Sequence, residues 1–183
     1  MSAEGLFPAP DRADMPAAPG NSVLSDAGLQ ITSRAEERFW KQVVRGPDSR
    51  CWIWCGAISS PDGYGRFTWQ VGGRRRTVSA HRVALMIAHG GELPPGLVGE
   101  HFCCEPLCVR VGEEHVRMTS QATNLARAVS LGRHVSNREV VASYDRAQRS
   151  CRVREAVING WDDTALHQAQ GVVLAPEEQP GLW

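Results

Sequence analysis

The chain has 183 residues, enough for one ordinary hydrophobic core, and its 20 basic and 20 acidic residues cancel to zero net charge. No apolar stretch reaches the ~20 residues that cross a bilayer, which excludes a transmembrane helix. The N-terminus lacks the basic and then apolar pattern of a secretory signal, so we expect a cytoplasmic protein without a membrane partner. There, six cysteines favour metal ligation or buried thiols over a disulfide framework.

The first segment, residues 1–32, is rich in Ala, Pro, Gly and Ser and has no apolar period. It predicts a disordered leader. Ser33 and Glu36 then have the spacing of a capping box, in which each side chain binds a free amide of the first helical turn. This pattern predicts a helix that runs to about Val44.

The middle of the chain alternates strand and helix patterns. In order, these predict strands at 51–55, 66–71 and 74–79, a helix at 80–90, and a short strand at 97–100. Gly72-Gly73 between two of these strands indicates a tight hairpin. Residues 102–114 contain Pro106 and little apolar period, so we expect an irregular loop there.

The last part of the chain is expected to be mainly helical. After a brief strand at 116–118, Thr119 or Ser120 caps a helix that ends near Gly132. Residues 133–183 then read as a helical tail of unknown role. The sequence therefore predicts an α+β domain over 33–132, with a small antiparallel sheet, between the leader and the tail.

The irregular loop contains side chains that zinc prefers, at a spacing that lets them face one point. These residues are Cys103, Cys108 and His115. A structural tetrahedral site needs a fourth ligand, and Cys51 is our choice because it would tie the first strand to the loop. Cys55 and Cys104 are alternatives, and the simpler interpretation is that all of these cysteines are buried thiols.

Two further residues at the ends of the segment 100–124 have the chemistry of a hydrolytic site. His101 follows a predicted strand, and an uncoordinated histidine near neutral pKa can take a proton from water. Asn124 lies on the helix after the loop, and its carboxamide oxygen suits Mg²⁺. On composition alone, the favoured interpretation is that His101 is a histidine at the surface or next to the metal ligands and that Asn124 is an ordinary helix residue.

Taken in order, these motifs resemble the HNH, or ββα-metal (His-Me finger), endonuclease family, in its zinc-stapled branch of phage and homing enzymes. The resemblance covers about residues 37–128. Its pieces are Phe39-Trp40, Cys51-Trp-Ile-Trp54, Gly63-Tyr-Gly-Arg-Phe67, Ala80-His-Arg82, His101-Phe-Cys103, Pro106-Leu-Cys108, His115-Val116 and 119–124.

The resemblance implies a zinc-bound ββα-metal finger that hydrolyses phosphodiester bonds of double-stranded DNA, leaving 5′-phosphate and 3′-hydroxyl ends. It assigns His101 as general base and Asn124 as ligand of a catalytic Mg²⁺ or Mn²⁺. Glu100 could be a second Mg²⁺ ligand or a solvated acid. The structural zinc would be held by the four ligands named above, Cys51, Cys103, Cys108 and His115.

The resemblance also implies contacts to the DNA backbone by arginines. Those expected at the nucleic acid are Arg66, Arg74, Arg75, Arg76 and Arg82. Residues 34–128 carry 13 Lys and Arg against 9 Asp and Glu, a modest basic surplus that permits DNA binding. Rival hypotheses are an inactive zinc-stapled DNA-binding module and a redox or zinc-sensing regulator that uses Cys55, Cys104 and Cys151. A homodimer is left open.

Overall fold

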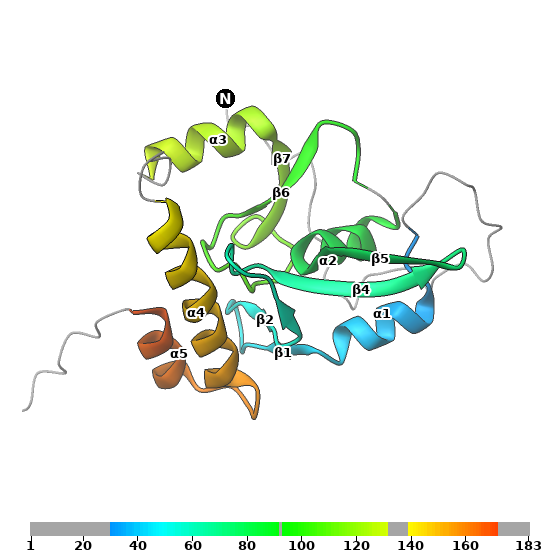
Figure 1. The fold of residues 1–183 in the computed structure, drawn as a ribbon. Coiled ribbons are helices and arrows are strands. Elements are labelled where there is room, and N and C mark those ends of the chain that lie inside the picture. Colours follow the sequence, from blue (N-terminus) through cyan, green and yellow to red (C-terminus); the bar gives the residue numbers. More distant parts are fainter. Residues whose placement is uncertain (1–29, 92, 132–138, 172–183) are drawn as a thin grey trace, which may run out of the picture.

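The computed structural model describes residues 30–91, 93–131 and 139–171, with the side chains of 139–145 left aside. Over this part of the chain the protein is α+β, as predicted, with five helices and seven strands (Figure 1). The strands form three small antiparallel sheets rather than one. Most of the predicted leader (residues 1–29) and parts of the tail (residues 132–138 and 172–183) lie outside the described residues.

The first helix is shorter than the sequence predicts. α1 spans Ser33–Trp40 and is capped by Thr32, whose hydroxyl accepts a hydrogen bond from the Ala35 amide at 3.2 Å. The predicted capping box and the extension to Val44 are therefore wrong. The β-branched residues that follow form β1 (Val43–Arg45), which pairs with β2 (Trp52–Trp54), because strand pairing satisfies their backbone groups at less steric cost.

The second sheet contains the predicted hairpin. β3 (Ala57–Ile58), β4 (Gly65–Val71) and β5 (Arg74–Ser79) lie in that order, and β4 and β5 project as a long arm (Figure 1). Gly72 and Gly73 form the turn with φ values of 55° and 72°, which glycine adopts without a Cβ penalty.

A hairpin followed by a helix makes the third unit. β6 (Leu97–His101) pairs with β7 (Val116–Ser120), and α3 (Gln121–Ser130) begins at once. The Ser120 hydroxyl accepts a hydrogen bond from the Thr123 amide, as the predicted cap requires. α2 (Ala80–His89) packs on β6 and β7 and ends at left-handed Gly90.

The hydrophobic core joins these units to the C-terminal helices. Phe39, Trp54 and Phe67 are buried in mutual ring contact, with centroids 5.0 to 5.8 Å apart. α4 (Glu139–Val157) lies beside β2 and β3, and α5 (Asp163–Gln170) packs against α4 (Figure 1). They bury Val153 and Leu166 in the same core. No helix in the described residues is long and apolar enough to cross a membrane.

Candidate functional site

The structure brings together the four predicted zinc ligands, Cys51, Cys103, Cys108 and His115. One ligand atom from each lies within 4.8 Å of all the others, so the cluster could hold a metal ion such as zinc. The Nδ1 atom of His115 is 3.6 Å from the Cys51 sulfur and 3.8 Å from the Cys108 sulfur. Tetrahedral zinc, with bonds of about 2.3 Å to sulfur and 2.0 Å to nitrogen, separates such atoms by about 3.6 Å. The residues therefore fit this ion.

Two contacts orient the ligands of this cluster. The Nε2 atom of His115 donates a hydrogen bond of 2.9 Å to the carbonyl of Ser49, which leaves Nδ1 as the ring atom that faces the sulfurs. An isolated bridge between Ile53 and Cys108 joins the loop to β2, beside Cys51. The loop and the first sheet thus meet at the metal cluster.

The sulfurs of Cys51, Cys103 and Cys108 are close enough for each to change the pKa of the others. Hydrogen bonds from Cys108 and Cys51 lower the pKa of Cys103, which favours its thiolate form. The hydrogen bond with Cys103 raises the pKa of Cys51 to about 12, and burial raises the pKa of Cys108. A bound cation would favour all three thiolates together.

The alternative ligands lie outside the cluster. The Cys55 sulfur donates to the Ile53 carbonyl at 3.6 Å, and burial raises the pKa of Cys55. Cys104 has a positive φ of 64° and its sulfur donates to the Phe102 carbonyl at 3.4 Å. Neither belongs to the group of metal-ligand types found in the described part of the chain.

His101 ends β6 next to the cluster without belonging to it. Its Nε2 atom lies 3.0 Å from the carbonyl oxygen of Cys108. Because a carbonyl only accepts, Nε2 carries the proton, and Nδ1 of the neutral ring is left as a base. Burial lowers the pKa of His101, partly offset by the charge of Cys103 and the bond to Cys108, so the ring is neutral near pH 7.

Two aromatic rings hold His101 in place. His81 on α2 meets it edge-on with centroids 4.4 Å apart, and Tyr64 stacks against it at 5.6 Å. His81 is buried, and its Nδ1 atom has no hydrogen-bond partner among the described residues. A Cβ on Gly99 would come within 2.8 Å of the His81 ring, so this glycine permits the close approach.

Glu100 points to the other face of β6, as neighbouring strand residues do. It is 4% exposed, and its two oxygens pair with Arg117 at 3.1 Å and Arg127 at 3.3 Å. Both guanidinium groups also lie over the Phe102 ring, 4.1 and 4.2 Å from its centroid. Glu100 is thus a buried, ion-paired acid. No sequence pattern predicts that these arginines pair with Glu100, because they come from β7 and α3.

Asn124 lies on the inner face of α3. It is half-buried together with Arg127 and Ala128, at the i, i+3 and i+4 positions, while its neighbours Thr123 and Leu125 are exposed. Arg127 on this face binds Glu100 on β6, so this face of α3 packs against the β6–β7 hairpin. Within the described residues no hydrogen bond uses the Asn124 carboxamide, whose oxygen can accept a cation.

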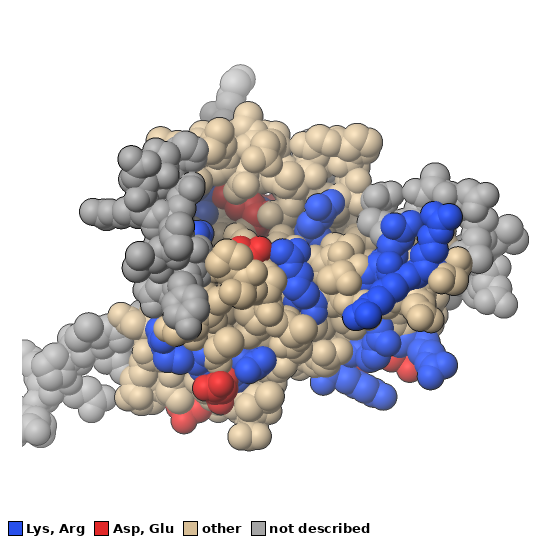
Figure 2. Space-filling model, viewed as in Figure 1, with Lys and Arg blue, Asp and Glu red and all other residues tan. Residues whose placement is uncertain are grey.

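The predicted DNA-binding arginines gather on the β4–β5 arm, where Figure 2 shows a concentration of basic side chains. Arg74 and Arg76 share one face of β5, and Arg75 lies on the other. All three are exposed, as is Arg82 at the start of α2. Arg66 is tied to Asp62 at 2.9 Å.

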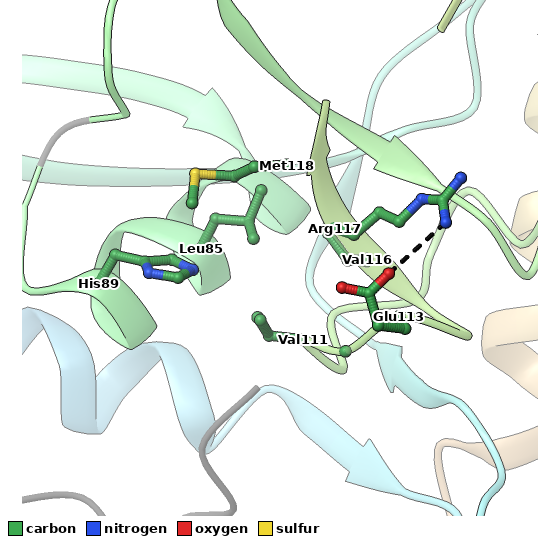
Figure 3. Close-up of a pocket in the computed structure, with 8 residues that line it drawn as sticks. Leu85, His89, Val111, Glu113, Val116, Arg117 and Met118 are labelled. Carbon is green, nitrogen blue, oxygen red and sulfur yellow. Dashed lines mark ion pairs between the residues drawn. The ribbon is translucent and has the colours of Figure 1, made fainter. Parts of the chain in front are cut away.

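A small cavity lies between α2 and β7, lined by Leu85, His89, Val116 and Met118 among others (Figure 3). At its rim Arg117 pairs with Glu113 at 3.6 Å. Its volume of about 30 Å³ has room for only a few water molecules, since one water needs about 10–15 Å³ on this measure. This cavity cannot hold a nucleotide or a comparable ligand.

Comparison with protein-family models, with curated proteins and with solved structures finds no match to this chain.

Proposed function

We propose that this protein is a metal-dependent endonuclease that hydrolyses phosphodiester bonds of double-stranded DNA. We also propose that it belongs to the HNH family that its sequence resembles, and that β6, β7 and α3 form the ββα unit. The Cys51, Cys103, Cys108 and His115 cluster would then be a structural zinc site.

The observation that carries the proposal is the state of His101. Its Nε2 proton is fixed on the Cys108 carbonyl, and burial keeps the ring neutral, so Nδ1 is a preoriented base. It would take a proton from the water that attacks phosphorus, a role worth about 10²- to 10⁴-fold in rate. The cleaved bond is the one to the 3′ oxygen, which leaves as a hydroxyl and gives a 5′-phosphate.

The second part of the proposal concerns Asn124. Its half-buried carboxamide on the inner face of α3 would hold Mg²⁺ or Mn²⁺. When bound, such an ion supplies neutralisation of the charge that grows on the phosphate and leaving oxygen. Glu100 is left as an ion-pair partner of Arg117 and Arg127, which already neutralise it.

The substrate is proposed to be duplex DNA because exposed arginines lie on the β4–β5 arm and on α2. Arg74, Arg75, Arg76 and Arg82 can contact backbone phosphates, which gives affinity without sequence selectivity. Arg66 is a weaker candidate, since Asp62 partly neutralises it.

The test is cleavage of supercoiled plasmid by the purified protein, with Mg²⁺ or Mn²⁺ added and zinc content measured on the same sample. We expect nicked or linear product that accepts ligation, and one zinc per chain. Absence of cleavage with either ion would contradict the enzyme.

One observation favours a second function. Glu100, which the resemblance offers as a second Mg²⁺ ligand, is buried and already paired with Arg117 and Arg127. A zinc-stapled DNA-binding module without catalysis would use the same arginines. It predicts salt-sensitive binding of duplex DNA with the plasmid left intact.

A further inference from the structure

Glu105 is an acidic residue in the middle of the metal loop, between Cys103 and Cys108. Its side chain is 2% exposed. A buried carboxylate is costly unless it is paired and hydrogen-bonded, so its partners indicate what the loop depends on.

The partners of Glu105 come from outside the metal loop. One carboxylate oxygen accepts a hydrogen bond of 3.1 Å from Arg149 on α4 and one of 3.0 Å from Gln170 on α5. The other oxygen accepts the Leu107 amide of the loop itself at 3.2 Å. One buried carboxylate therefore connects the metal loop to both C-terminal helices.

The same turn leads to His101. The Cys108 amide donates to the Glu105 carbonyl at 3.0 Å, which closes the turn. The Cys108 carbonyl then accepts the Nε2 proton of His101, and its sulfur belongs to the metal cluster. On its other side the loop is held by β2, where the Val109 amide donates to the Trp52 carbonyl at 2.8 Å.

We propose that Glu105, held by Arg149 and Gln170, is a positioning residue that fixes the Cys108 carbonyl and through it the ring of His101. The helices α4 and α5 are then a functional part of the site. The effect on catalysis rests on the proposed endonuclease function, whereas the effect on the metal cluster and on the His101 ring does not. Residues outside the shell of metal ligands commonly change affinity or activity by about 10- to 100-fold.

The test uses the full chain loaded with zinc. Arg149→Met removes the charged partner and keeps the length of the side chain, and Gln170→Met removes the neutral one. Arg149→Lys is the conservative variant. Arg152→Met, an exposed arginine on the same helix, is the matched control for the lost charge.

Three measurements separate positioning from general stability. They are the rate of zinc release to a chelator, the solvent exchange of the His101 Nε2 proton by NMR, and the exchange of the Phe67 amide on β4, which reports on the stability of the core. Positioning predicts that Arg149→Met speeds zinc release and His101 exchange about tenfold or more, with Phe67 exchange unchanged. Arg149→Lys should recover part of the loss, and Arg152→Met should match the parent.

Cleavage is measured on the same variants. If the parent cuts plasmid, Arg149→Met should lower kcat about tenfold with KM unchanged, because substrate binding does not involve this residue. A parent that does not cut overturns the proposed function, but the zinc and NMR results still decide the positioning role. That role is overturned if zinc release and His101 exchange match the parent, or if Phe67 exchange rises equally. Should Arg149→Met fail to fold, Gln170→Met decides by the same two criteria.

Discussion

The Nε2 atom of His101 lies 3.0 Å from the main-chain carbonyl of Cys108, a member of the metal cluster. This single contact joins the two parts of the site. It fixes the tautomer of His101, and it makes the orientation of that ring depend on the loop that the cluster closes. A substitution that disrupts the metal loop should therefore also disturb the orientation of His101. A substitution of His101 should leave the metal loop folded.

The first prediction concerns replacement of the proposed base, His101. We expect His101→Ala to reduce plasmid cleavage by about 10²- to 10⁴-fold, because the variant lacks the proposed general base that takes the proton from water. Zinc content and the thermal midpoint should stay close to those of the parent, since His101 is not a member of the cluster. Undiminished cutting by this variant would remove His101 from the mechanism.

Loss of a metal ligand should have the opposite pattern. Cys108→Ser is expected to lose the metal and to unfold at ordinary temperature, since structural zinc contributes about 10–16 kcal/mol and a domain of this size is stable by only about 5–15 kcal/mol. Cys104→Ser in the same loop is the matched control, because its thiol lies outside the cluster. Metal analysis and circular dichroism are the measurements. Equal stability of the two variants would contradict a structural metal.

The sequence predicted the parts of the site that depend on residue type and local spacing. Cysteine and histidine within one short loop indicate metal ligands, and Gly72-Gly73 indicates a hairpin, because both signals are local. The strand β1 was not predicted, because its three residues follow α1 closely and no glycine or proline separates them from the helix. Cys51 could be selected only by argument about the fold, because it is 64 residues from His115.

The contacts that set the environment of the site could not be predicted. Glu105 meets Arg149 over a separation of 44 residues and Gln170 over 65, and no periodic pattern relates them. Likewise, the ion pairs of Glu100 depend on the register of β6 with β7 and on the packing of α3. Side-chain pairs of this kind are decided by packing in three dimensions.

Buried His81 should make the stability of the fold depend on pH. Burial, and then the nearby His101 and Arg82, lower the pKa of His81 well below 6.5. The unfolded chain therefore takes up a proton below pH 6.5 that the folded chain does not. The stabilisation is complete above pH 6.5 and is lost as the pH falls towards the folded pKa.

The variant His81→Phe removes this titration and keeps a ring against His101. In zinc-saturated protein, the free energy of unfolding from urea titrations should fall less steeply between pH 6.5 and 5 than in the parent. The difference should reach at most about 1.4 kcal/mol per pH unit. Identical slopes for the two proteins would show that His81 binds protons equally in the folded and unfolded states, so that its pKa is not lowered by the fold.

The arginines of the β4–β5 arm are expected to give the DNA affinity its salt dependence. Replacing Arg74, Arg75 and Arg76 by Gln should weaken duplex binding equally for unrelated sequences, because phosphate contacts do not select bases. The slope of log K against log salt should decrease in magnitude by about 0.9 for each phosphate contact removed. Fluorescence anisotropy at several salt concentrations measures both effects.

Arg152→Gln, exposed on α4, controls for net charge. Because Arg74 and Arg76 lie on one face of β5 and Arg75 on the other, single replacements will identify the face that meets the duplex. An unchanged slope in the triple variant would place the DNA elsewhere on the protein.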